Sequence, residues 1–248
     1  AGKTTLLHVL AGRKNAGTIT GRICMNGEPK KHGTFCRLSG YVEQHDALSP
    51  KLTVRELLEF SGNLRLPQST TARDRSGLAD RLVAMLQLSA VQHERLKDVS
   101  RGERKRVSIG IELMANPSTV FLDEPTTGLD ASGAQTVMRA VHEICYTMQV
   151  AFLCTIHQPV QEQFFMFDHL VLMQRGGSLI YFGPTGPEAS ALVAYLRGLP
   201  DVGPLPACAN PADWMLQVIG AGVGHDDGRA AYLTAVFYES NHFEDAKD

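Results

Sequence analysis

The sequence predicts an α/β fold with an antiparallel β part near the N-terminus and a helical insertion ahead of the second half of the core. Three observations support this prediction. Strands and helices alternate over most of the 248 residues. A short apolar strand ends in two adjacent carboxylates, Asp123 and Glu124. Near the N-terminus, Gly2-Lys3-Thr4-Thr5 is typical of a phosphate-binding loop.

Composition narrows the class of protein. A hydrophobic content of 44% and a charged content of 20% are ordinary for a globular domain. The net charge of -2 gives no electrostatic argument for binding nucleic acid. The five cysteines form no CxxC pair and are odd in number, so we interpret them as reduced residues rather than a zinc site. We expect no signal peptide, and the given residues contain no apolar run of the roughly 18 residues that a membrane span needs.

The first residues match the end of the pattern GxxxxGK[ST]. Its first four positions would precede Ala1, so we expect the chain to begin inside the motif. Apolar residues at helical spacing follow, and Gly12 is a plausible C-cap. Lys3 would reach the β- and γ-phosphates of a nucleotide, and the Thr4 hydroxyl would bind Mg²⁺. For this motif alone, a solvated lysine at an ordinary helix start remains an alternative.

Two strands are predicted next. Residues Thr18 to Met25 alternate in polarity and end in Asn26-Gly27, which is a hairpin signal. Residues Leu38 to Val42 form a second short apolar run, which Gln44 follows.

The helical insertion begins at Thr53, where Thr53 and Glu56 form a capping box for a helix to about Leu64. An amphipathic helix is predicted from Leu78 to Leu88. Between them, the polar stretch from Gln68 to Arg75 is expected to be an exposed connection.

A second capping box, Ser100 with Glu103, predicts a helix to about Ala115. Its start carries a hydroxyl at Ser100 and a glycine amide at Gly102, which together suit an anion at a helix N-terminus. The alternative is a capped helix with a basic exposed face at Arg104-Lys105-Arg106.

The acidic strand, Val120 to Leu122, delivers Asp123 and Glu124 to its carboxyl end, and Pro125 stops it. Ionised carboxylates are costly to bury unless they are paired or near a metal. In phosphoryl-transfer enzymes one such carboxylate helps to hold Mg²⁺ and another orients or deprotonates the attacking water. Asp130 then precedes a long helix from about Ser132 to Thr147.

A continuous apolar strand, Val150 to Ile156, ends at His157, which could contact a γ-phosphate or be a histidine satisfied at a strand end. Beyond it we expect the following elements in order: a short helix over 159–167, a hairpin of strands 169–173 and 179–182, a helix over 187–199, an irregular stretch over 200–211, and a helix that Asn210 caps.

These motifs stand in a fixed order: AGKTT, Gln44, VSRGE, FLDEPTTGLD and His157. The chain resembles the nucleotide-binding domain of ATP-binding cassette (ABC) transporters. Finer stretches resemble the G group and, within it, the pleiotropic drug resistance transporters: LAGR, GTITG, SGYVEQHD, LTVRELLEFS, GERKRVSIGIEL, CTIHQP, GGSLIYFGP and NPADWML. The resemblance runs to about Val218.

The resemblance implies a role for each motif residue. Gly2, Lys3, Thr4 and Thr5 would be the end of Walker A, Gln44 the Q-loop glutamine, Ser100 and Gly102 the signature residues, Asp123 the Walker B carboxylate, Glu124 the catalytic glutamate, Asp130 part of the D-loop, and His157 the switch histidine. The implied metal ligands are Thr4, Gln44 and Asp123, and the implied cofactors are ATP and Mg²⁺.

The resemblance also implies the organisation. Residues 1–218 would be the nucleotide-binding domain, with a helical subdomain over about 53–116, and residues 219–248 would lead to a transmembrane domain of the same protein. That domain would dock near residues 48–57. A second nucleotide-binding domain would be the partner, nucleic acid would not, and this domain would lie on the cytoplasmic face of a membrane.

The expected function is ATP hydrolysis that powers transmembrane transport, with export of lipophilic or xenobiotic substrates. Arg101 stands where the signature usually has a glycine. A nucleotide-holding module with little hydrolysis is therefore one alternative, and a soluble ABC ATPase acting on DNA or ribosomes is another.

Overall fold

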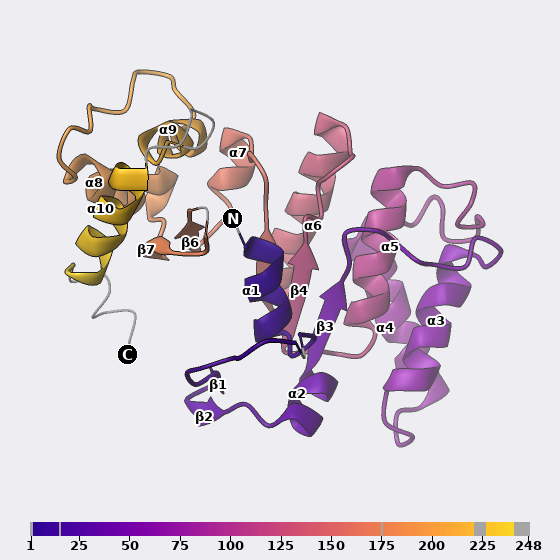
Figure 1. Cartoon of the computed structure of the whole chain (residues 1–248). Coiled ribbons are helices and arrows are strands. Elements are labelled where there is room, and N and C mark those ends of the chain that lie inside the picture. The colour runs from indigo at the N-terminus through magenta and orange to yellow at the C-terminus, as the bar shows by residue number, and fades with distance from the viewer. Residues whose placement is uncertain (1, 15, 175, 221–226, 241–248) are drawn as a thin grey trace. The chain divides into compact units, whose positions relative to one another are not determined.

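The computed structural model describes residues 2–14, 16–174, 176–220 and 227–240. The chain divides into two compact units, one of residues 4–157 and one of residues 158–248 together with 1–3. Figure 1 shows the elements of each unit. Among the described residues no helix is both long enough and apolar enough to cross a membrane.

A three-stranded parallel sheet forms the centre of the larger unit (Figure 1). Its strands are β3 (Ser39–Val42), β4 (Thr119–Asp123) and β5 (Ala151–Thr155), with β4 in the middle. Val42 pairs with Leu122, and Asp123 with Thr155. Because the carboxyl ends of parallel strands meet at one edge, the residues that follow these strands converge there. All three predicted strands are confirmed.

Gly12 was predicted to end the first helix, and Asp130 was predicted to precede a long helix; the structure agrees with both. Helix α1 (Lys3–Leu10) is followed by Gly12 with a φ of 72°, and the Arg13 amide donates to the His8 carbonyl at 2.8 Å. Helix α6 (Ala131–Met148) has Asp130 as its N-cap.

The β part near the N-terminus is smaller than predicted. It contains only β1 (Cys24–Met25) and β2 (Glu28–Pro29), joined by Asn26 and Gly27 with φ values of 52° and 79°. The turn is therefore confirmed, but the strand predicted from Thr18 is wrong before Cys24. Residues 16–22 are exposed and lack a surface to pack against, so polarity alternation alone did not produce a strand. Helix α2 (His32–Leu38) was not predicted.

The helical insertion consists of α3 (Val54–Arg65), α4 (Ala72–Met85) and α5 (Arg101–Leu113). The capping boxes before α3 and α5 are confirmed. Helix α4 begins six residues before the predicted Leu78, because Thr71 caps it by accepting from the Asp74 amide. The prediction of an exposed connection is therefore wrong from Ala72 onward.

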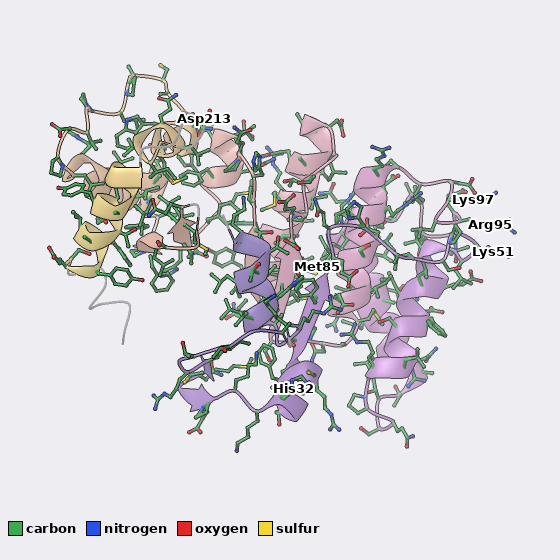
Figure 2. All side chains as sticks on the ribbon, in the orientation of Figure 1. His32, Lys51, Met85, Arg95, Lys97 and Asp213 are labelled. Carbon is green, nitrogen blue, oxygen red and sulfur yellow. The ribbon has the colours of Figure 1, made fainter. Side chains whose placement is uncertain are left out.

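At one end of this helical part, segments 50–54 and 92–97 lie side by side. The Leu96 amide donates to the Leu52 carbonyl at 2.9 Å. Three exposed cations, Lys51, Arg95 and Lys97, lie together there (Figure 2).

The smaller unit has its own apolar core around an antiparallel hairpin. Its elements are α7 (Gln161–Phe164), β6 (His169–Met173), β7 (Leu179–Pro184), η1 (Pro187–Ala189), α8 (Ser190–Arg197), α9 (Pro211–Val218) and α10 (Asp227–Tyr238). The hairpin and the Asn210 cap are confirmed. Helix α10 was not predicted, and its Leu233 and Phe237 are buried. Residues 221–226 and 241–248 of the expected linker lie outside the described part of the chain.

Candidate functional site

Asp123, the last residue of β4, accepts hydrogen bonds from three hydroxyl groups. Thr4 of α1 and Thr155 of β5 donate to its Oδ1 at 3.0 and 2.6 Å, and Tyr41 of β3 approaches its Oδ2 at 3.4 Å. The Asp123 side chain is buried, so these hydroxyls replace the water that an ionised carboxylate would otherwise bind. Burial, and then the neighbouring Asp123 charge, raise the pKa of Tyr41 above its ordinary value, so Tyr41 remains a hydrogen-bond donor.

Glu124 has a backbone conformation that few non-glycine residues adopt, with a φ of 47°. Its amide donates to the Thr155 hydroxyl at 2.9 Å. Its Oε2 accepts from Gln44 Nε2 and from the Thr127 hydroxyl, both at 3.0 Å. The turn in the backbone therefore separates the two carboxylates, because Asp123 faces buried hydroxyls and Glu124 faces partly exposed polar groups.

A cavity of about 400 Å³, lined by polar and charged residue types, opens at this edge of the sheet. Arg13 lies over the Tyr41 ring, 4.3 Å from its centroid, and pairs with Glu43 at 2.8 Å. The volume lies within the range of small-molecule sites. The cavity is lined by His8, Arg13, Tyr41, Glu43, Gln44, His45 and Asp123.

The oxygen atoms beside this cavity fit magnesium better than a transition metal. Mg²⁺ is usually bound through one or two carboxylates, with the remaining positions taken by water and substrate phosphate. Asp123 supplies a carboxylate and Thr4 a hydroxyl 3.0 Å from it. No group of three or more His, Cys, Asp or Glu side chains that could hold a metal occurs in the described part of the chain. Gln44 is hydrogen-bonded to Glu124, so its role as a metal ligand stays a prediction.

The structure brings together four of the predicted site residues: Thr4, Gln44, Asp123 and Glu124. Gly2 and Lys3 directly precede Thr4 at the start of α1, and Gly2 has a φ of 95° that favours glycine. Thr5 is exposed on the first turn of the same helix.

The other predicted residues lie at the starts of α5 and α6 and at the end of β5. The Ser100 hydroxyl and amide both donate to Glu103, at 2.7 and 2.8 Å, and this bonding lowers the pKa of Glu103. A Cβ on Gly102 would lie 3.5 Å from the Gly133 Cα, so the starts of α5 and α6 are close. Asp130 accepts from the Gly133 amide at 3.3 Å.

Arg101 is exposed as the first residue of α5, and His157 is exposed just beyond β5. No hydrogen bond in the described part of the chain joins Ser100, Gly102, Asp130 or His157 to the group around Asp123.

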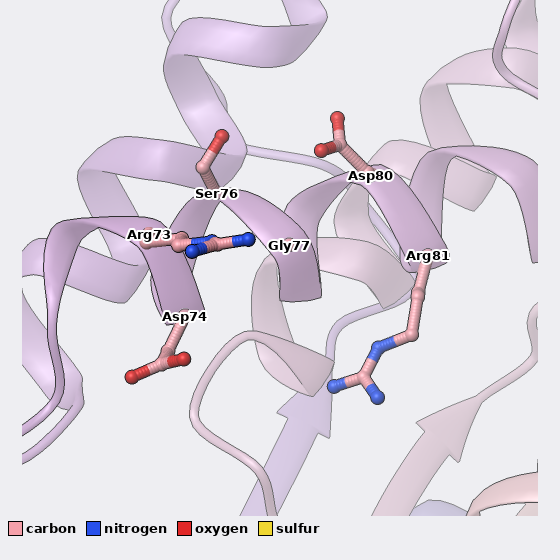
Figure 3. A pocket seen from close by; sticks show the side chains of 6 residues that line it. All are labelled: Arg73, Asp74, Ser76, Gly77, Asp80 and Arg81. Carbon is pink, nitrogen blue, oxygen red and sulfur yellow. The ribbon is translucent and has the colours of Figure 1, made fainter.

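A second hollow, of about 670 Å³, lies on the surface of α4 (Figure 3). Its lining comes from a single helix, and one member, Asp80, is already paired with Arg55 of α3. It contains none of the predicted site residues, and we interpret it as the charged outer surface of the helical part. The lining residues are Arg73, Asp74, Ser76, Gly77, Asp80 and Arg81.

Sequence reasoning missed three residues of the site. Thr155 is the polar last residue of an apolar strand and is in register with Asp123, so strand pairing could have identified it. Tyr41 shares β3 with Val42, but nothing in its spacing distinguishes it from a core aromatic. Lys105 appeared to belong to an exposed basic face, yet its side chain is only 4% exposed and it donates to loop residues 43–46.

Comparison with known proteins gives concordant results. Residues 1–127 match the family model described as "ABC transporter". ABC transporter G family member 41 of Arabidopsis thaliana is 42% identical over 249 residues, covering 97% of this chain and 18% of the relative. ABC transporter G family member 45 of Oryza sativa subsp. japonica is 46% identical over 223 residues, covering 88% and 16% respectively. The chain therefore spans less than a fifth of the length of these relatives.

One solved structure is similar with a TM-score of 0.56 at 18% identity, covering 68% of this chain and 75% of the other. It is a dimeric ATP-binding cassette protein in a post-hydrolysis state, bound to ADP and Pi. This similarity confirms the predicted fold class.

Proposed function

This chain belongs to the ABC transporter family, and we propose that it binds and hydrolyses ATP as the motor domain of a membrane transporter. Its relatives carry the G family name, as the sequence motifs predicted. The observation that carries the proposal is the arrangement at the carboxyl edge of the sheet. There Asp123 holds three hydroxyls, while Glu124 is held separately by Gln44 and Thr127.

The start of α1 is the proposed phosphate site. A helix N-terminus presents free amides and the positive end of the helix dipole, which attract anions. Lys3 adds a cation there, Gly2 allows close backbone approach, and Thr5 adds a hydroxyl on the same turn. Asp123 and Thr4 would hold Mg²⁺, with Gln44 as a further ligand, and the ion would supply neutralisation of phosphate charge.

Glu124 is the proposed catalytic carboxylate. It would orient the attacking water, and the amide of Gln44 and the hydroxyl of Thr127 restrict the positions that its carboxylate can take. His157 would donate to the charge that develops on the phosphoryl oxygens.

The proposed assembly needs a second nucleotide-binding domain and a transmembrane domain. Ser100 and Gly102 at the start of α5 would close on nucleotide bound to the partner domain, and Asp130 would lie at the same junction. We assign residues 1–218 to the nucleotide-binding domain and 219–248 to the connection with the transmembrane domain. The domain would work at the cytoplasmic face of a membrane and power export of lipophilic or xenobiotic substrates. Support comes from the dimeric neighbour and from the names of the relatives.

A second candidate function is a nucleotide-holding module with little hydrolysis. Arg101 favours it, because this cation takes the place of a signature glycine at the start of α5.

Glu124→Gln in the complete protein tests the proposal. Loss of a group that handles a proton at the reacting water should lower ATP hydrolysis by about a hundredfold or more. ATP binding should persist, because Lys3, Thr4 and Asp123 are unchanged. Glu143→Gln, on the exposed surface of α6, is the matched control and should hydrolyse ATP normally. Near-normal turnover by the Glu124 variant would contradict catalysis by Glu124, and tight ATP binding with almost no turnover in the unaltered protein would favour the nucleotide-holding module.

A further inference from the structure

Lys105 of α5 is a buried cation whose hydrogen bonds all go to one loop. Its ammonium donates to the Glu43 carbonyl at 2.9 Å, the Gln44 carbonyl at 3.1 Å and the Asp46 Oδ1 at 2.7 Å. The Lys105 side chain is 4% exposed and that of Asp46 is 12% exposed. An ammonium has three donors, so the three acceptors satisfy it completely.

The two carbonyls belong to the peptide groups on either side of the Gln44 Cα. Because each peptide group is planar, holding both carbonyls restricts the backbone angles of Gln44 and therefore the direction of its side chain. That side chain donates from Nε2 to Glu124 at 3.0 Å. A short series of contacts thus leads from α5 through the loop to the proposed catalytic carboxylate.

Other anchors of the loop are weaker or indirect. Arg13 pairs with Glu43, but their side chains are 44% and 58% exposed, and solvent screens such surface pairs so that they contribute little. The Ser108 hydroxyl donates to Asp46 at 2.7 Å but contacts neither carbonyl beside Gln44. A buried ammonium that loses its hydrogen-bond acceptors is strongly destabilising, so displacement of the loop from Lys105 would be opposed.

We propose that Lys105 is a positioning residue, which holds loop residues 43–46 so that the Gln44 amide stays on Glu124. The proposal rests on the proposed hydrolysis of ATP, in which Glu124 orients the attacking water. Lys105 is not itself among the residues that line the cavity around Asp123, and no hydrogen bond in the described residues joins it to Glu124. It acts through the backbone carbonyls of Glu43 and Gln44, two residues that do line the cavity.

The next residue provides a matched control. Arg106 is also a buried cation of α5, and its guanidinium donates to the carbonyls of Leu86 and Gln87 at 2.8 and 3.0 Å. These carbonyls lie at the C-terminal end of α4, away from the loop. Lys105→Met and Arg106→Met therefore each remove one buried cation that binds two carbonyls, but only the first frees Gln44.

The experiment uses the complete protein and measures kcat and KM for ATP, together with amide hydrogen exchange of residues 43–46 without nucleotide. Lys105→Met should lower kcat about ten- to hundredfold, because a misplacement near 1 Å can cost that much, and should change KM less than about threefold. Exchange at residues 43–46 should become faster. Lys105→Arg should recover most of kcat, since a guanidinium can still donate to the carbonyls. Arg106→Met should accelerate exchange around residues 86–88 and leave kcat within about threefold.

Two results would overturn the proposal: unchanged exchange at residues 43–46 in Lys105→Met, or an equal loss of kcat in Lys105→Met and Arg106→Met. If Lys105→Met does not fold, the double variant Asp46→Asn/Lys105→Met removes the carboxylate left without its partner and is measured in the same way. Failure of the proposed function would appear differently, as full turnover in Glu124→Gln. The exchange measurement needs no hydrolysis and so tests the loop independently.

Discussion

The carboxyl edge of the sheet and the helical part of the same unit are held together by different forces. At the edge, single hydrogen bonds join groups that are far apart in sequence, such as Thr4 and Asp123, which are 119 residues apart. In the helical part, leucines with no exposed surface pack around α5, and Gly110 fits so closely that a Cβ would lie 2.8 Å from Leu86 and 2.9 Å from Leu58. Substitutions at the edge should therefore change chemistry more than stability, and substitutions in the helical part should do the reverse.

Lys105 is an exception, because it connects the helical part with the edge of the sheet. It is buried within the helical part, yet its bonds end on the loop that carries Gln44. A cation of the helical part thus binds the loop at the edge, whereas the guanidinium of Arg106 binds carbonyls at the end of α4.

Thr155→Val should show the largest effect of the predictions that follow from this contrast. The hydroxyl of Thr155 donates to Asp123 and accepts from the Glu124 amide, so its loss affects both carboxylates at once. We expect ATP hydrolysis by the complete protein to fall about tenfold or more, because an unsatisfied buried polar group costs about 1–3 kcal/mol and both groups can shift. Hydrolysis rates normalised to folded protein measure this.

Thr155→Ser restores the hydroxyl without the methyl group and should return hydrolysis to within about threefold of normal, since both hydrogen bonds can reform. The opposite result would be that Thr155→Val is largely unfolded but that its folded molecules hydrolyse ATP at the normal rate. That result would contradict the contrast, because it would mean that the edge is mainly structural.

A comparison of Gly110→Ala with Gly77→Ala tests whether substitutions in the helical part change stability rather than hydrolysis. Both glycines lie inside helices, so both gain about 1 kcal/mol of helix propensity as alanine. Gly77 has open space where a Cβ would go, whereas Gly110 does not. Overpacking should leave Gly110→Ala about 1–3 kcal/mol less stable than Gly77→Ala, with hydrolysis per folded molecule unchanged in both. The difference in stability between the two variants is measured by thermal unfolding and, separately, by hydrogen exchange of the α5 amides. Equal stability of the two variants would contradict the prediction.

Much of the fold followed from local rules in the sequence. Capping boxes at Thr53 and Ser100 located two helices, and an apolar run ending in acids located β4. Local rules failed where neighbours decide the outcome. Residues 18–22 alternate like a strand but are exposed and pair with no strand in the described part of the chain. The early start of α4 has a different cause, because Thr71 and Asp74 cap it through a local pattern that the prediction did not use.

The site was predictable to the extent that its residues occur in motifs. Thr4, Gln44, Asp123 and Glu124 were identified and lie together. Thr155 and Lys105 were missed because their roles depend on strand register and on burial, which no local spacing records. Arg104-Lys105-Arg106 illustrates the limit: a basic run that suggests a solvated face contains two buried cations with different partners.

The smallest predicted effect concerns pH and Tyr41. Burial and the Asp123 charge raise the pKa of Tyr41 in the folded state, so above a pH of about 10 the unfolded chain loses this proton before the folded chain does. The stability that Tyr41 contributes should therefore be complete below about pH 10 and decline as pH rises further.

The difference in unfolding free energy between the unaltered protein and Tyr41→Phe measures this contribution, because the effects of the other tyrosines cancel in the difference. It should stay constant from about pH 7 to 9 and shrink from about pH 10 to 11. The change should be modest, since Tyr41 is only partly buried and solvent screens its interaction with Asp123. A difference that grows with pH would mean that the Tyr41 phenolate is favoured in the fold, and the hydroxyl would then not be a permanent donor to Asp123.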